Sequence, residues 1–263
     1  MRRRYILGSV FVSFAVFGST ASEIVRYGEE RLRGDTAQTL LSMKIVRPTY
    51  TRELKLQSWT VGNQKSLIRI LEPAKEEGVV SLRVGEQMWN YLPKADHIIR
   101  VPSTLMLQSW MGSDFTNDDL MKLSSLGSDY EHKILRTEKL AGEMTTLIEC
   151  APKPNAPVVW GKILYWARPD KLPVKEDFYD ENGQLIRTLS LSDFKKMDDR
   201  VIPTRLKITK AESPGESTVV IYEKALFNRP IEDSLFDKEQ LKAISRRKKD
   251  FAEKKSATPT TGS

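Results

Sequence analysis

Between Gly34 and Phe236, apolar and polar residues alternate with a period of two in short pieces bounded by Gly, Pro, Asn and Asp. Such alternation predicts strands with one buried face, and the pieces amount to about ten or eleven strands. They are YTRELKLQSWTVGN, KSLIRILEP, GVVSLRVG, QMWNYLP, the hairpin YEHKILRTEKLAGEMTTLIECAP, VVWGKILYWARP, the hairpin LPVKEDFYDENGQLIRTLSLSDF, RVIPTRLKITKA and STVVIYEKALF.

The connections between these pieces are too short for crossover helices, so the sheet should be antiparallel. The piece VVWGKILYWA is apolar on both faces: Val159, Ile163 and Tyr165 alternate with Val158, Trp160, Leu164 and Trp166. A flat sheet would leave one of these faces in water. We therefore expect a mainly β protein of the α+β class, with a sheet strongly curved around inserted helices or around an apolar ligand.

Two short helices are predicted beside the strands. SEIVRYGEERLRGDT spaces its apolar residues by three and four and stops at Gly34, which predicts a helix over about residues 22–33. In FTNDDL, Thr116 can cap a helix whose third residue is Asp119, a variant of the capping box. Phe115 and Leu120 then form a hydrophobic staple. This pattern predicts a helix over residues 117–124.

Both ends of the chain differ from its middle. Residues 1–21 begin with three arginines, continue with an apolar run and end in small residues, which is typical of a secretory signal peptide cleaved after about Ala21. Residues 22–236 form one domain with equal numbers of basic and acidic residues, so the basic excess gives no reason to expect a nucleic-acid partner. Residues 237–263 have the composition of a basic, flexible tail, either solvated or touching anionic lipid.

The composition disfavours most catalytic sites. The chain has two histidines and one cysteine, and no His-x-x-x-His or Cys-x-x-Cys spacing occurs. A phosphate-binding glycine loop is absent, and the nucleophile elbow around Ser113 is incomplete. We expect no metal, no cofactor and no enzymatic activity; the open alternative is a lipid hydrolase that uses Ser113 or His97. Cys150 is expected to be a buried free thiol.

An unusually apolar connection precedes the second helix. STLMLQSWMGSDF contains Leu105, Met106, Leu107, Trp110, Met111 and Phe115. Because methionine adapts to partners of varied shape, one interpretation is a lid over an apolar groove. The other is a plug that fills the open end of the sheet. Both interpretations are compatible with the sequence.

Several of these segments resemble a known family. RPTYTRELKLQSW, KSLIRILEPAKEEG, MWNYLPKADHIIRVP, SWMGSDFTNDDL, APVVWGKILYWAR and DFYDENGQLIRTLSLSDF together resemble the outer-membrane lipoprotein-sorting proteins, in the branch related to LolA and LolB. The likeness runs from about Arg33 to Phe236, and SWMGSDFTNDDL is its most specific motif. The resemblance implies an unclosed antiparallel β-barrel with short helices over its concave, apolar side.

The resemblance also implies a periplasmic carrier, which would bind the acyl chains of lipoproteins or other lipids in an apolar groove for transfer toward the outer membrane. It would contact membranes transiently. Because members of this branch accompany exporters of the RND type, the alternative is an adaptor that docks on an inner-membrane exporter and carries no lipid. Arg69 and Arg100 are the candidates for the arginine that latches the lid in this family.

Eight residues are expected at the lipid site, each of which could equally be plain core packing. The expected lid is Trp110, Met111, Phe115 and Leu120, and the expected wall is Trp59, Trp89, Tyr91 and Met106.

Overall fold

The computed structural model describes residues 19–121 and 126–247. The helices in this part are α1 (Ala21–Arg33), α2 (Asn117–Met121), α3 (Leu126–Asp129) and α4 (Leu241–Ser245), with 3-10 turns η1 (Ser103–Leu105), η2 (Trp110–Gly112), η3 (Asp233–Phe236) and η4 (Lys238–Gln240). The strands are β1 (Thr36–Val46), β2 (Thr51–Val61), β3 (Lys65–Glu72), β4 (Val80–Val84), β5 (Gln87–Leu92), β6 (His97–Arg100), β7 (Tyr130–Leu140), β8 (Glu143–Pro152), β9 (Lys162–Ala167), β10 (Pro173–Tyr179), β11 (Leu185–Met197), β12 (Arg200–Lys210) and β13 (Ser217–Phe227).

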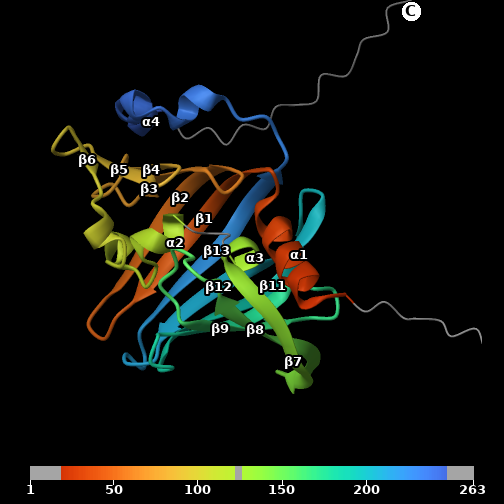
Figure 1. Ribbon diagram of the computed structural model, residues 1–263. Helices are drawn as coiled ribbons and strands as arrows, with labels where there is room; N and C mark the ends of the chain where they lie inside the picture. Colours follow the sequence, from red (N-terminus) through yellow and green to blue (C-terminus); the bar gives the residue numbers. More distant parts are fainter. Residues whose placement is uncertain (1–18, 122–125, 248–263) are drawn as a thin grey trace, which may run out of the picture.

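All of the strands in the described residues form one sheet, in the order β6-β5-β4-β3-β2-β1-β13-β12-β11-β10-β9-β8-β7. The pairs are antiparallel, and β6 and β7 stand at opposite edges, so the barrel is not closed. Figure 1 shows the sheet curving around α1, α2 and α3. The expected fold class is confirmed, including the helices on the concave side.

The structure contains two strands that the alternation did not predict, β1 and β6, which brings the number of strands in the described chain to thirteen. β1 reads TAQTLLSMKIV and is rich in residues that favour helices. Its pairing with both β2 and β13 overrides that preference and joins the two halves of the sheet. β6 is a four-residue edge strand whose side chains are all exposed, so burial leaves little pattern in its sequence.

The N-terminal helix agrees closely with the expected residues 22–33. α1 begins one residue earlier, at Ala21, where the side chains of Thr20 and Glu23 form a capping box. Thr20 and Ala21 belong to the segment expected to be removed as a signal peptide, and cleavage after Ala21 would remove this cap. Residues 1–18 of that segment lie outside the described residues. No helix in residues 19–121 and 126–247 is long and apolar enough to cross a membrane.

The strand predicted from VVWGKILYWA is shorter than expected and its alternation breaks at Gly161. β9 begins at Lys162, and a Cβ on Gly161 would lie 2.5 Å from the carbonyl oxygen of Asp180. Because the chain is not extended before Lys162, Val158 and Trp160 pack into the same cluster as Ile163 and Tyr165 instead of facing away from them.

The concave face carries two apolar clusters, one on each half of the sheet. The connection before α2 covers the first half, where Trp110 and Phe115 pack on residues of β1 to β5. α1 and α3 cover the second half, where Ile24 and Leu126 pack on β8, β9 and β10. The connection before α2, together with α1 and α3, therefore covers the concave face of the sheet.

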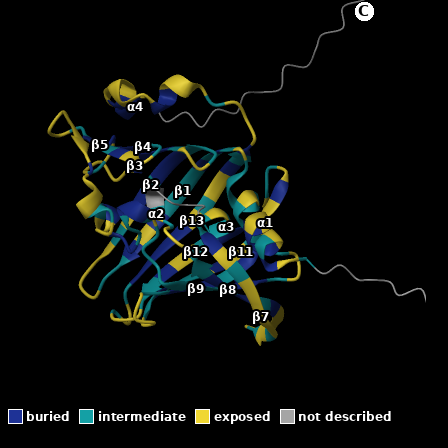
Figure 2. Ribbon diagram, viewed as in Figure 1, coloured by how far each residue is buried: buried dark blue, intermediate teal, exposed yellow. Residues whose placement is uncertain are grey.

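The convex face is covered where the sequence predicted a flexible tail. η4 and α4 lie within residues 237–263, yet Leu241 and Ile244 are fully buried against Leu67, Val80 and Leu82 of β3 and β4. Figure 2 shows α4 exposed on its outer side and buried toward the sheet. The packed part of the chain thus extends beyond Phe236; residues 248–263 lie outside the described residues.

Replacing Ile244 with valine should lower the free energy of unfolding by about 1 kcal/mol, because it removes one buried methylene from this contact. Urea unfolding followed by circular dichroism measures the change. Ala243, which is exposed on the same helix, gives the matched control as Ala243→Ser. An unchanged unfolding midpoint for Ile244→Val would show that α4 does not pack on the sheet in solution.

Candidate functional site

A cavity of about 280 Å³ lies between the concave face of the sheet and α1, α2 and α3. Apolar side chains from both halves of the sheet form most of its wall, so it bridges the two concave clusters. The apolar wall includes Leu41, Leu56, Ile68, Ile163, Leu189, Leu206, Ile208 and Val220. Its volume is near the lower end of the range of about 300–1,000 Å³ that is usual for small-molecule pockets.

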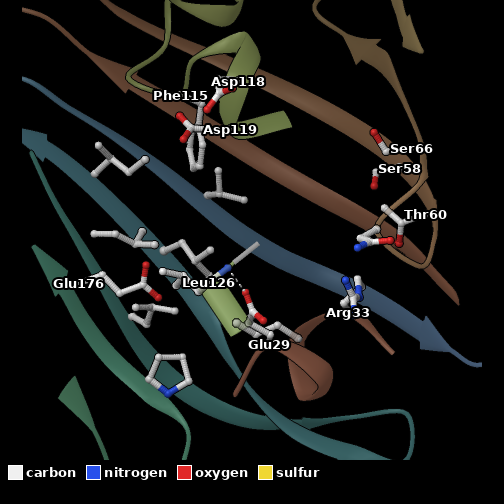
Figure 3. A pocket seen from close by; sticks show the side chains of 18 of the residues that line it. Glu29, Arg33, Ser58, Thr60, Ser66, Phe115, Asp118, Asp119, Leu126 and Glu176 are labelled. Atoms are coloured by element: carbon white, nitrogen blue, oxygen red, sulfur yellow. Dashed lines mark hydrogen bonds between the residues drawn. The ribbon is translucent and has the colours of Figure 1, made fainter. Parts of the chain in front are cut away.

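Polar side chains enter this cavity from three directions. Figure 3 shows Asp118 and Asp119 of α2 beside Phe115, Glu29 and Arg33 of α1, and Glu176 of β10 projecting inward from the opposite side. Ser58, Thr60 and Ser66 line it from β2 and β3. The cavity is therefore apolar in its wall but carries charged groups at defined places.

The connection at Trp110 is held by hydrogen bonds to β4, to β2 and within itself. The Trp110 indole nitrogen donates to Ser81 Oγ at 3.0 Å, and the backbone nitrogen of Trp110 donates to the Phe115 carbonyl oxygen at 2.8 Å. The guanidinium of Arg52 donates to the Met111 carbonyl oxygen at 2.8 Å. Trp110 is 2 % exposed and lines the cavity.

Asp114 is the centre of the polar contacts under that connection. Its carboxylate accepts two hydrogen bonds from the Arg47 guanidinium, at 3.1 and 3.2 Å, and one from the Thr218 hydroxyl at 2.7 Å. The side chain of Asp114 is 1 % exposed. A buried carboxylate with these partners fixes the segment to β1 and β13.

α2 is held by a different acid. The capping box predicted from the sequence is present: Thr116 N donates to Asp119 Oδ2 at 2.7 Å, and Asp119 N donates to Thr116 Oγ1 at 3.1 Å. The same carboxylate receives both terminal nitrogens of Arg187 on β11, at 2.6 and 2.5 Å. The Arg187 guanidinium also lies over the rings of Trp160 and Phe178, at 4.6 and 4.5 Å. Arg187 therefore connects α2 to the sheet across the cavity.

Arg187 joins α2 to the concave side of the sheet, whereas Arg69 and Arg100, the two arginines that the resemblance suggested, lie elsewhere. Arg69 lies on the convex face and donates to the Arg247 carbonyl oxygen. Arg100 is exposed on the edge strand β6. Strand order alone suggested those two, but side chains of alternate residues point to opposite faces, which excludes Arg69 from the concave side.

Two carboxyl groups in the cavity are shifted toward their neutral forms. Burial raises the pKa of Glu176 to about 8, and the nearby Glu29 adds to this effect while Arg187 opposes it. Burial also raises the pKa of Glu29, although its carboxylate accepts hydrogen bonds from Leu126 N at 2.8 Å and Gly127 N at 3.0 Å. A strongly shifted acid inside a cavity is a common mark of a functional site.

Of the eight expected lipid-site residues, four lie on the concave side of the sheet, three lie on the convex side, and the side chain of one is not described. Trp110 and Phe115 line the cavity, and Met106 and Met111 pack against the same concave cluster. The backbone of Leu120 lies in α2, but its side chain is outside the described residues. Trp59, Trp89 and Tyr91 lie on the convex face, where they pack with Leu235 and Ile244. Those three side chains therefore do not line this cavity.

The residues considered for catalysis lie apart from one another. The Ser113 hydroxyl is buried and donates to the Trp110 carbonyl oxygen at 2.7 Å, which is a turn contact. His97 is exposed on β6. Cys150 is a buried free thiol, and burial raises its pKa.

The sequence reading missed Arg187, Glu176 and Glu29. Arg187 and Glu176 occupy inward positions in strands whose other inward residues are apolar, such as Leu189 and Phe178. A charged residue at an apolar position of an alternating strand is the signal that could have identified them.

A protein-family model described as "-like: Uncharacterized protein" matches residues 62–243. No curated protein matches the chain. Three solved structures share its fold over 84 % of its length.

The first of these structures is a DUF1329 family protein from Desulfovibrio piger, with a TM-score of 0.77, 21 % identity and 97 % of that chain covered. A putative outer membrane lipoprotein-sorting protein domain from Vibrio parahaemolyticus has a TM-score of 0.73, 22 % identity and 98 % coverage. A LolA superfamily protein from Nitrosomonas europaea has a TM-score of 0.71, 26 % identity and 99 % coverage. The chain thus belongs to the family of the matching model, and its structural neighbours include a DUF1329 family protein, a putative outer membrane lipoprotein-sorting protein domain and a LolA superfamily protein.

Proposed function

We propose that this protein is a periplasmic carrier that holds an acyl chain of a lipoprotein or another lipid in the cavity and delivers it toward the outer membrane. The observation that carries the proposal is the cavity of about 280 Å³, which the protein's own side chains leave inside an apolar wall. The likeness to the LolA superfamily protein and to the lipoprotein-sorting domain supports the same direction. No catalytic chemistry is part of this function.

The energetics of such a cavity favour binding of a single chain. Each buried methylene contributes about 0.8 kcal/mol, so about ten methylenes contribute roughly 8 kcal/mol. Part of this is offset by the loss of freedom of the chain and of the side chains that close around it. The net binding free energy is therefore smaller than roughly 8 kcal/mol, so a chain can bind and also be released, as a carrier requires.

Release would require a movable part of the cover. The Trp110 connection is fixed by Asp114 and Ser81, whereas α2 is held across the cavity through the pair of Asp119 and Arg187. We therefore propose that α2 moves to open the cavity, together with Phe115, which precedes the cap of this helix. The segment from Trp110 to Asp114 would remain in place as wall.

Replacing Leu41 with tryptophan should reduce affinity for decanol about tenfold or more, because Leu41 lines the cavity and the larger ring would occupy the space of the chain. Isothermal titration calorimetry measures the affinity, and far-UV circular dichroism reports whether the fold is retained. Ile221→Trp is the matched control, since Ile221 is exposed on β13 beside the partner of Leu41.

Two outcomes would oppose the carrier function. Equal decanol affinity in Leu41→Trp and the parent protein would place the ligand elsewhere. Protein purified from its native periplasm without any extractable lipid by mass spectrometry, together with cross-links to an inner-membrane exporter, would favour the adaptor function instead.

A further inference from the structure

Two polar side chains lie next to each other in the buried wall of the cavity. Tyr165 on β9 and Glu176 on β10 occupy directly opposite positions of the two strands. The Tyr165 hydroxyl is buried without a hydrogen bond, in a residue that is 1 % exposed. Glu176 is 8 % exposed and lines the cavity. Buried polar groups in native proteins are almost always satisfied, so the unsatisfied Tyr165 hydroxyl beside a buried carboxyl group needs an explanation.

α1 comes unusually close to this pair. A Cβ at Gly28 would lie 2.2 Å from the Tyr165 hydroxyl oxygen, so only glycine permits the helix to pass at this point. The helix thereby closes one end of the cavity over Tyr165 without supplying a hydrogen bond to it. The unsatisfied Tyr165 hydroxyl therefore lies where α1 covers the cavity.

The charges that face Glu176 are largely engaged with other partners. Glu29 of α1 accepts from two backbone nitrogens at the start of α3, and Asp119 of α2 is bound to Arg187 of β11. Arg187 is the guanidinium that favours an ionised Glu176, and both of its terminal nitrogens bind Asp119. Arg33, which also lines the cavity, acts on Glu29. An ionised Glu176 would lack a counter-charge of its own, in keeping with the raised pKa of this group.

We propose that Glu176 and Tyr165 form the head-group subsite of the cavity, and that this subsite takes a protonated amine carried on an acyl or alkyl chain. The inference rests on the proposed function, since it assumes that the apolar wall holds the chain. An ammonium group supplies several donors and a positive charge beside Glu176. A carboxylate or phosphate head group at the same place would meet ionised Glu176 as a like charge.

The test compares three ligands with the same ten-carbon chain, decylamine, decanol and decanoate, by isothermal titration calorimetry at pH 7.5 and below their micelle concentrations. Decylamine should bind about tenfold tighter than decanol, and decanoate should bind most weakly. Glu176→Gln should remove the preference for the amine while it leaves decanol affinity within about twofold. Tyr165→Phe should weaken decylamine binding and retain the order of the three ligands.

The control is Glu181→Gln, which removes an exposed carboxylate in the turn between β10 and β11 and should leave all three affinities unchanged. If the three ligands bind equally, or if Glu176→Gln keeps the preference for decylamine, the head-group subsite is refuted while the carrier function survives. Tighter binding of decanoate would also refute it. If none of the ligands binds, the acyl cavity itself is refuted, and the subsite with it.

Discussion

Asp114→Ala should lower the free energy of unfolding by about 3–5 kcal/mol, an effect much larger than that of an average substitution. The variant leaves the Arg47 guanidinium without its buried partner and the Thr218 hydroxyl, which is fully buried, without its acceptor. Arg47 keeps Glu216 at 3.5 Å, which offsets only part of the loss. The connection that carries Trp110 should detach from β1 and β13 as a result.

Urea unfolding followed by circular dichroism measures the stability change. Asp233→Ala is the control, because Asp233 pairs with Lys65 at 2.9 Å but has a side chain that is 82 % exposed. It should change stability by less than about 1 kcal/mol. A loss in Asp114→Ala no greater than that of the control would mean that the buried ion pair does not secure the segment.

Local sequence patterns predicted most of the strands because alternation and turn residues act over a few positions. At Ala141-Gly142 both residues have the positive φ values that a two-residue hairpin turn requires, whereas in the longer connection that contains Asn182-Gly183 the positive φ is at Gly183. β1 was missed because its helix-favouring residues are extended only through pairing with β2 and with the distant β13. Its strand state depends on contacts that no local window contains.

The candidate site was predicted only in part, for a related reason. Alternation separates the two faces of a strand but does not say which face becomes concave. Trp59 and Trp89 were therefore assigned to the groove although they lie under the C-terminal helical segment on the convex side. Phe115 was assigned correctly to the cavity because it belongs to a local motif, the residue before a capped helix. That helix lies over the cavity, and Phe115 lines it.

Asp119 shows how a local motif can have a long-range role. Its capping contact with Thr116 spans three residues and was predictable, whereas its partner Arg187 is 68 residues further along the chain. The structure joins the two only because β11 passes beneath α2. One carboxylate, that of Asp119, thus makes both the capping contact with Thr116 and the ion pair with Arg187. The formation of α2 and its attachment to the sheet therefore depend on the same side chain.

Arg187→Met should lower the free energy of unfolding by about 3 kcal/mol and accelerate release of a bound chain. Methionine has a similar volume, but it leaves Asp119 without its counter-charge and removes the one positive charge that favours ionised Glu176. The cation–π contacts with Trp160 and Phe178 are lost as well. α2 would then be held by its cap and by the contacts of Asn117 and Asp118 with the preceding connection, without its attachment to β11, so its open form should become more populated.

Stopped-flow displacement of a bound fluorescent acyl chain measures the release rate, and urea unfolding measures the stability. Asp119→Asn should accelerate release by a similar factor. The release rate of Arg187→Lys should lie between those of Arg187→Met and the parent protein, because lysine keeps the charge but cannot make the paired hydrogen bonds. The double variant Arg187→Met/Asp119→Asn should release the chain no faster than either single variant, since both changes break one contact. Additive effects, or an unchanged release rate in a destabilised Arg187→Met, would show that the pair stabilises the fold without gating the cavity.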